Sequence, residues 1–143
     1  MNVGLGTDGV KENNRADIFQ EMKNASMMHR IAHENAQIMK AEEAFKMATV
    51  NGSRALKMKS GEIREGFLAD VVLLDAKAPN MNPIYEEHVL SQVVFSAHPG
   101  NIKVIIVDGR LAVENGKVIS VDEKETVEMS VRRGKDLLKR LSH

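Results

Sequence analysis

The stretch VIIVDGRLAVENGKVI, residues 104–119, decides the local fold of the second half of the chain. Three short runs rich in Val, Ile and Leu are separated by the dipeptides Asp108-Gly109 and Asn115-Gly116. Asp-Gly and Asn-Gly are preferred in two-residue hairpin turns, because both turn positions require positive φ. The stretch therefore predicts a three-stranded antiparallel meander.

Apolar patterns on either side of the meander predict further elements. The run Val71-Val72-Leu73-Leu74 is typical of a strand buried on both faces. Between that run and the meander, residues 84–94 are ambiguous, and we expect a short helix at residues 86–90. After the meander, Asp122 and Glu125 form a capping box. It precedes a final helix with an apolar stripe of Val127, Val131, Leu138 and Leu141.

The first part of the chain, residues 16–56, has a helical period instead. Ile18, Met22 and Ala25 recur at helical spacing, and Asn13 and Asn14 precede them as candidate N-caps. A second helix is expected over residues 41–49, ended by Asn51-Gly52 and followed by one more turn. The pattern alone indicates an α/β to α+β fold, in which helical patterns give way to strand patterns near residue 60.

Composition excludes several functional classes. The chain has 143 residues, 20 Lys and Arg against 20 Asp and Glu, and no cysteine. Zero net charge argues against a nucleic-acid or anionic-membrane partner, and the basic run near residues 132–140 is expected to be a solvated helix face. The absence of cysteine rules out disulfides, thiolate metal ligands and a cysteine nucleophile. With no membrane-length apolar run and no signal-peptide pattern, we expect a soluble cytoplasmic protein.

Residues 4–9, GLGTDG, match the G-x-G-x-x-G pattern of dinucleotide-binding proteins. That site needs a preceding strand and a helix that opens at the third glycine. Only three residues precede Gly4, and residues 10–14 have loop character, so a tight turn after a short strand is the better interpretation.

Asp8 lies after that short strand, where side chains of parallel α/β folds point into active sites. A carboxylate there can ligate a metal or move a proton, but from the local sequence alone an Asx-turn residue before Gly9 is the better interpretation. His29 and His33 share a helix face at i and i+4 and could bind zinc together, although structural histidines are the simpler reading. His98 has no companion ligand nearby in the sequence.

Taken in order, short blocks along nearly the whole chain resemble the C-terminal portion of the metal-dependent amidohydrolases. The branch most similar contains the S-adenosylhomocysteine/methylthioadenosine deaminases and the chlorohydrolase-like enzymes. The blocks are VGLGTDG (3–9), Asn13-Asn14 with Asp17, FQEMK (19–23), MATVNG (47–52), Ala55-Leu56, GEI (61–63), Glu65-Gly66, ADVV (69–72), VFSAH (94–98) and VIIVDGR (104–110).

The resemblance implies a division of the chain into three parts. Residues 1–60 would form the last strand-helix unit of a (β/α)8 barrel, with residues 1–6 as its eighth strand. Residues 61–121 would form part of the flanking small β-sandwich, and residues 122–143 a C-terminal helix that packs back on the body.

The resemblance also implies a role for Asp8 as the aspartate that closes a metal site and helps to deprotonate the attacking water. The family's histidine ligands and catalytic glutamate would precede residue 1, so Asp8 is a single ligand of an incomplete site. The family commonly has Ser where Gly9 stands, and no substrate-contacting residue is carried over.

These observations lead to three functional hypotheses. In the first, the chain is the C-terminal segment of a deaminase that depends on zinc or another divalent metal. The isolated segment is then expected to bind no metal and to have no hydrolytic activity. In the second, it completes the metal site of a separate N-terminal barrel chain that binds the small-molecule substrate. In the third, it is a non-catalytic module. Exposed apolar faces and strand edges predict a homo-oligomer in any isolated form.

Overall fold

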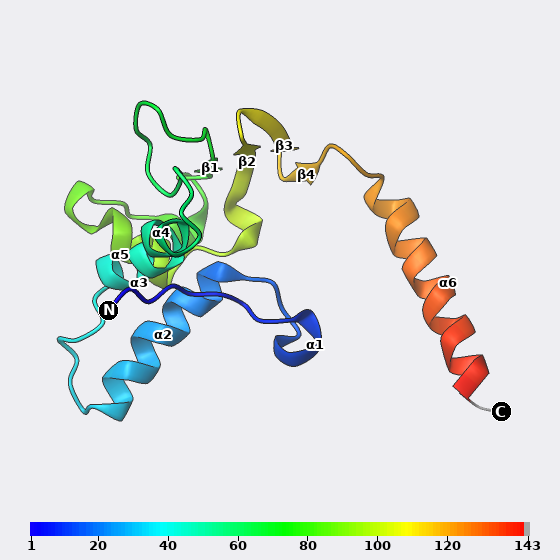
Figure 1. Cartoon of the computed structure of the whole chain (residues 1–143), viewed down its shortest axis with the longest axis horizontal. Helices are drawn as coiled ribbons and strands as arrows, with labels where there is room; N and C mark the ends of the chain where they lie inside the picture. The colour runs from blue at the N-terminus through cyan, green and yellow to red at the C-terminus, as the bar shows by residue number, and fades with distance from the viewer. Residues whose placement is uncertain (142–143) are drawn as a thin grey trace.

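The computed structural model describes residues 1–141 as a four-stranded sheet, a cluster of helices against it and one helix that projects away (Figure 1). Three 3₁₀ turns, Pro79–Met81, Glu86–His88 and Pro99–Asn101, join these elements. The helices are α1 (Val10–Asn13), α2 (Ile18–Ala32), α3 (Ala41–Ala48), α4 (Val50–Ala55), α5 (Val89–Phe95) and α6 (Glu123–Leu141). The strands are β1 (Val71–Leu74), β2 (Ile102–Val107), β3 (Arg110–Glu114) and β4 (Lys117–Val118).

The predicted meander is confirmed. Strands β2, β3 and β4 pair antiparallel with their neighbours, and Ile105 lies opposite Val113. Asp108 and Asn115, the first residues of the two turns, have φ of 48° and 51°, and the glycine after each is also positive. These are the angles for which Asp-Gly and Asn-Gly are selected.

Strand β1 departs from the prediction of burial on both faces. It pairs antiparallel with β2 at the edge of the sheet, in the order β1-β2-β3-β4. Val72 and Leu73 are each 51% exposed. The continuous apolar run is typical of a central parallel strand, whereas here the described residues cover only part of the strand's surface.

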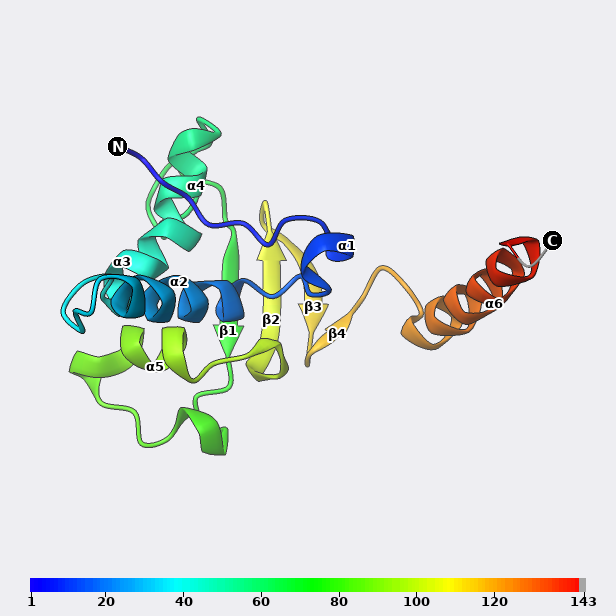
Figure 2. The ribbon, with the colours of Figure 1, turned by 90° about the horizontal axis from the view of Figure 1, so that it is seen from below.

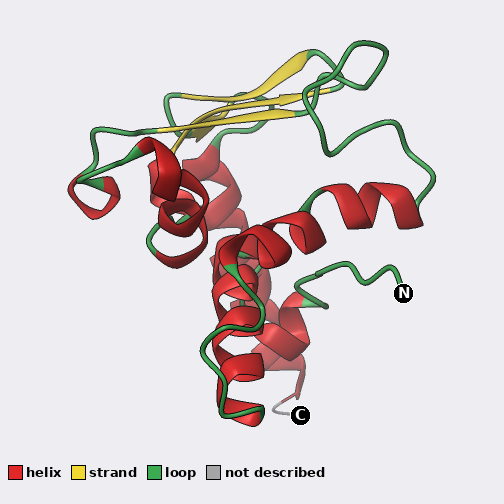
Figure 3. Cartoon of the chain, turned by 90° about the vertical axis from the view of Figure 1, so that its left-hand side faces the viewer, coloured by secondary structure: helices red, strands yellow, loops and turns green. Residues whose placement is uncertain are grey.

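A small aliphatic core joins α2, α3 and α5, which lie on one side of the sheet (Figures 2 and 3). Met22, Ala41, Ala44 and Val94 are buried, and phenylalanines from the same three helices pack around them. Ala41 and Ala44 are inward-facing residues of the predicted second helix, whose position is confirmed. Ser26, fully buried on α2, donates to the Met39 carbonyl and so ties the loop after α2 to this core.

The helix boundaries differ from the sequence prediction in three places. Asp17, not Asn13 or Asn14, caps α2, because its carboxylate accepts hydrogen bonds from two amides of the first turn, Phe19 and Gln20. Residues Val10–Asn13 form the short helix α1 instead of a loop. Asn51-Gly52 lies inside α4, and the break between α3 and α4 falls at Thr49.

Residues 1–6, expected as a strand, form no strand in the described chain. The segment crosses the helices (Figure 2) and is attached at few points. The Leu5 amide donates to the Met47 carbonyl at 2.9 Å. The Asn2 side chain donates to the Asn51 carbonyl, and the Asn51 side chain donates to the Val3 carbonyl. A β-ladder needs a neighbouring strand, and residues 1–141 offer this segment none.

Helix α6 begins as predicted, with the Asp122 carboxylate accepting from the Glu125 amide at 3.0 Å. The resemblance implied that this helix packs back on the body; no such packing is seen within residues 1–141, and the packing stays a prediction for the whole protein. Figures 1 and 2 show it projecting into solvent beyond β4, and every residue from Glu123 to Leu141 is exposed. No helix within residues 1–141 is long and apolar enough to cross a membrane.

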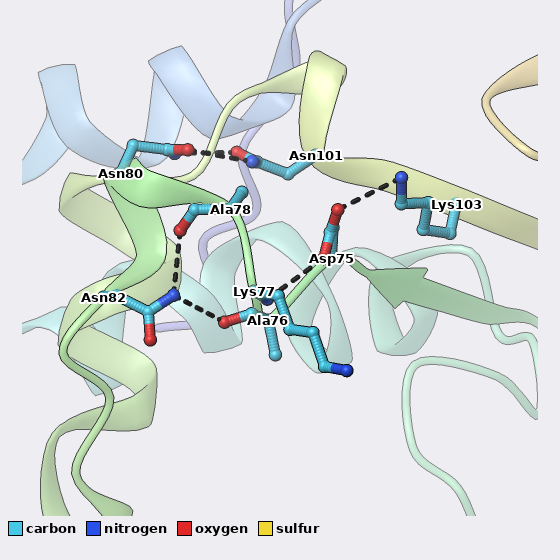
Figure 4. Close-up of polar contacts among 8 residues, drawn as sticks. All are labelled: Asp75, Ala76, Lys77, Ala78, Asn80, Asn82, Asn101 and Lys103. Carbon is cyan, nitrogen blue, oxygen red and sulfur yellow. Dashed lines mark hydrogen bonds and ion pairs between the residues drawn. The ribbon is translucent and has the colours of Figure 1, made fainter.

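A pair of asparagine side chains fixes the loop after β1 to the start of β2 (Figure 4). Asn80 and Asn101 exchange two amide hydrogen bonds of 2.9 and 3.0 Å. Asn101 is buried, its side-chain oxygen also accepts from the His98 amide, and its own carbonyl accepts from the Asp75 amide. The Asn101 residue thus satisfies polar groups from three segments at once.

Replacing Asn101 by alanine is expected to lower the free energy of unfolding by about 1–3 kcal/mol, because partners of its amide lose their hydrogen bonds. The matched control is Asn82→Ala. Asn82 is exposed and donates to two carbonyls of the same loop, so we expect a smaller loss. Urea unfolding followed by circular dichroism measures both, and equal losses for the two variants would contradict this account.

The Asp75 carboxylate provides a titration prediction. The pKa of Asp75 lies below its usual value. The larger cause is a hydrogen bond from the Lys103 side chain to the carboxylate, and the next is a hydrogen bond from the backbone amide of Lys77. A depressed pKa means that the stabilisation is present above the unfolded-state pKa and is lost as pH falls through the folded-state value. Lys103→Met should therefore raise the Asp75 pKa, measured by carboxyl-carbon NMR titration. Lys77→Met, which keeps the backbone amide, should raise it less, and the reverse order would refute the assignment.

Candidate functional site

Asp8 lies at the end of the N-terminal segment, two residues before α1. Its backbone is left-handed, with φ of 56°, a conformation that Asp and Asn tolerate better than other side chains that carry a Cβ. One carboxylate oxygen, Oδ1, accepts from the Gly9 amide at 2.7 Å. The residue is exposed, and its second carboxylate oxygen makes no hydrogen bond within residues 1–141. One hydrogen bond to the following amide thus holds the Asp8 carboxylate, and its other oxygen is accessible.

Asn13 attaches the segment before Asp8 to α2. Its amide nitrogen, Nδ2, donates to the Thr7 carbonyl and to the Glu21 carboxylate, both at 2.8 Å. These bonds connect the residue before Asp8 to α1 and α2. Sequence reasoning took Asn13 for a helix cap and missed its positioning role, which no local pattern signals, because it depends on a contact with Glu21 eight residues away.

The glycine pattern around Asp8 has a structural explanation. Gly4 passes close to α4, where a Cβ would lie 3.4 Å from the Gly52 Cα. Gly9 precedes α1, a helix of four residues, and no strand precedes Gly4. The strand that a dinucleotide site requires is thus absent from this segment of the described chain, and the helix that follows Gly9 has only four residues.

The three histidines considered as ligands do not gather around Asp8. His29 and His33 stack against each other on exposed turns of α2, with ring centroids 6.1 Å apart. The His98 ring instead accepts from the Gly100 amide through Nδ1 at 3.1 Å, which caps the turn before β2.

The donor set of residues 1–141 is therefore too small for a catalytic metal. Within the described range, no three side chains of His, Cys, Asp or Glu lie close enough to hold an ion. Catalytic zinc takes three protein ligands, and Asp8 can supply one oxygen. Residues 1–141 do not by themselves fit a complete metal centre.

Comparison with curated proteins finds close relatives among nucleoside deaminases. The chain is 41% identical over 128 residues to a 5-methylthioadenosine/S-adenosylhomocysteine deaminase of Pyrococcus horikoshii, covering 90% of this chain and 30% of that protein. It is also 41% identical over 128 residues to a 5'-deoxyadenosine deaminase of Methanocaldococcus jannaschii, covering 90% of this chain and 30% of that protein. The chain thus spans about a third of the length of the curated relatives it matches.

Solved structures share the fold. An adenosine deaminase of Xanthomonas campestris with bound zinc superposes with a TM-score of 0.89 at 27% identity, over 98% of this chain and 32% of that one. The zinc complex of the atrazine chlorohydrolase TrzN of Arthrobacter aurescens superposes at 0.81 and 21% identity, over 92% and 29%, a likeness of fold alone. The model of the amidohydrolase family matches residues 1–112, which is more than half of the sequence, and the chain belongs to that family.

Proposed function

We propose that this chain forms the C-terminal part of a metal-dependent hydrolase that deaminates adenosine-type nucleosides. The observation that carries the proposal is the 41% identity to two proteins named as deaminases of such nucleosides. A third relative, the Xanthomonas campestris adenosine deaminase, holds zinc in its crystal structure.

The three parts of the chain would then have distinct positions in the whole enzyme. Residues 1–60 would supply the last strand and helices of a (β/α)8 barrel, residues 61–121 part of a small β-sandwich, and residues 122–143 a terminal helix. Two features support this division. Residues 1–6 lie against the helices without a strand partner, and β1 has one unpaired edge. Both are compatible with neighbouring strands outside residues 1–141.

In this proposal Asp8 acts at the reacting centre. The Gly9 amide bond orients its carboxylate, and the accessible oxygen accepts the proton of the water that attacks the purine carbon bearing the amino group. Asn13, through Thr7 and Glu21, keeps the segment before Asp8 in register with α2 and is a positioning residue. Zinc or another divalent metal in the whole enzyme would supply Lewis acidity, through ligands beyond those described.

The chain by itself is expected to be catalytically silent, because one carboxylate cannot retain a catalytic metal. The purified 143-residue chain, incubated with zinc and 5'-methylthioadenosine, should release no ammonia above the buffer rate, and isothermal titration should detect no tight zinc binding. Robust turnover would contradict the proposal. Turnover that appears only when a barrel chain is added would favour a two-chain hydrolase completed in trans.

A chimera tests the role of Asp8. The part of the Pyrococcus horikoshii deaminase that precedes the matched region would be joined to this chain. We expect the zinc-loaded chimera to deaminate 5'-methylthioadenosine. Asp8→Asn should lower kcat by about 10²–10⁴-fold, because the substituted carboxamide can still accept a hydrogen bond from the Gly9 amide but cannot take a proton.

The matched control is Asp136→Asn, which removes a carboxylate from an exposed position of α6 and should leave kcat unchanged. A folded chimera in which Asp8→Asn retains full kcat would refute the role of Asp8. A folded, zinc-loaded chimera that is inactive with native Asp8 would favour a non-catalytic module.

A further inference from the structure

Two histidines lie side by side at the C-terminal end of α2. His29 is in the last turn of the helix and His33 is its C-cap residue, four positions later, so both side chains leave the same face. Their ring centroids are 6.1 Å apart, and their planes differ by 14°. Both residues are exposed. The structure thus brings two imidazoles together at the surface, an arrangement that helical spacing permits but does not require.

The ring nitrogens of this pair are available to a ligand. Neither the His29 ring nor the His33 ring makes a hydrogen bond or an ion pair within residues 1–141. His98 differs, because its Nδ1 already accepts from the Gly100 amide. A neutral imidazole has one nitrogen lone pair with which it can bind a metal ion. The pair on α2 therefore offers two unused nitrogen donors, one from each ring.

The separation of the two rings is close to that of a shared metal ion. Zinc binds imidazole nitrogen at about 2.0–2.1 Å, so two rings on one ion, in tetrahedral or octahedral coordination, have centroids about 4.5–5.5 Å apart. The observed 6.1 Å is slightly larger. Both side chains are exposed and no hydrogen bond holds either ring within the described residues, so a small side-chain rotation would close the difference.

The surrounding charges favour a cation at this place. Arg30 lies between the two histidines in sequence, but its guanidinium donates to the Ile38 and Met39 carbonyls and lies over the Phe95 ring. Its charge is therefore directed to the loop after α2 and to α5. The exposed Glu34 follows His33 directly and adds a negative charge. The carbonyl end of a helix also attracts positive charge, because the helix dipole is negative there.

We propose that His29 and His33 form a surface site for a divalent transition-metal ion, such as Zn²⁺, Ni²⁺ or Cu²⁺. Imidazole suits these ions, whereas Mg²⁺ and Ca²⁺ prefer oxygen ligands. Within residues 1–141 no third His, Cys, Asp or Glu side chain joins the pair, so water completes the coordination shell. With two protein ligands the site binds more weakly than a catalytic zinc centre with three and exchanges its ion readily. Cu²⁺ should bind more tightly than Ni²⁺ or Zn²⁺.

A zinc titration of the 143-residue chain, followed by NMR of the imidazole signals, tests the site. We expect the His29 and His33 signals to shift together and to saturate at one ion per chain, whereas Mg²⁺ at the same concentration shifts neither. His29→Gln and His33→Gln should each raise the zinc Kd by about tenfold or more, because each removes one of two ligands. The matched control is His88→Gln, which removes an exposed histidine of the turn Glu86–His88 and should leave the Kd unchanged.

Thermal unfolding gives a second readout, because an ion that binds the folded chain stabilises it. Saturating zinc should raise the Tm of the native chain and of His88→Gln, but of neither α2 variant. Without metal, the circular dichroism of the α2 variants should match that of the native chain, since both side chains are exposed and lie outside the core.

Three outcomes would overturn the proposal: histidine signals that zinc leaves unmoved, an unchanged Kd in the two α2 variants, or binding that is lost in His88→Gln. The site is built from α2 alone and does not depend on the proposed deaminase function. That function is measured by kcat on the chimera, so failure of one proposal is distinguishable from failure of the other.

Discussion

The amide pair between Asn80 and Asn101 is the interaction on which the arrangement of sheet and helices depends. Asn101 ends the turn before β2, and its carbonyl accepts from Asp75 just after β1, so the two strands are fixed to each other at this end. Asn80 donates to the Ser96 carbonyl and accepts from Gln92, which fixes α5 to the same point. Because α5 contributes Val94 to the core, the contacts of Asn80 and Asn101 connect the helical cluster to the sheet.

The sequence predicted the elements whose cause is local. The Asp-Gly and Asn-Gly turns, the period of α2 and the inward alanines of α3 depend on residues at most a few positions apart, and each was placed correctly. The errors concern elements whose surroundings matter. The apolar run of β1 says nothing of how many strands flank it, and the segment before Asp8 has strand composition but no strand beside it. A stripe on α6 likewise predicts that something covers it, not what does.

The candidate site shows the same limit more sharply. Local reasoning favoured an Asx-turn residue over a functional carboxylate at Asp8. In the structure one carboxylate oxygen accepts from the next amide and the residue is exposed, and its functional role stays a prediction. Only the family resemblance singled it out as catalytic. The contact from Asn13 to Glu21 depends on the docking of α1 on α2, which is a tertiary event with no sequence signature.

The open edge of β1 has a consequence for handling the chain. Val71–Leu74 is a short apolar run without a charged side chain, and it pairs with β2 along one edge only. Within residues 1–141 no strand pairs with the other edge, and exposed valine and leucine lie beside it. Such an edge templates extension by further β-strands. Precipitation into β-rich aggregates, and not thermal unfolding of the helical core, would then set the upper concentration at which the isolated chain can be kept.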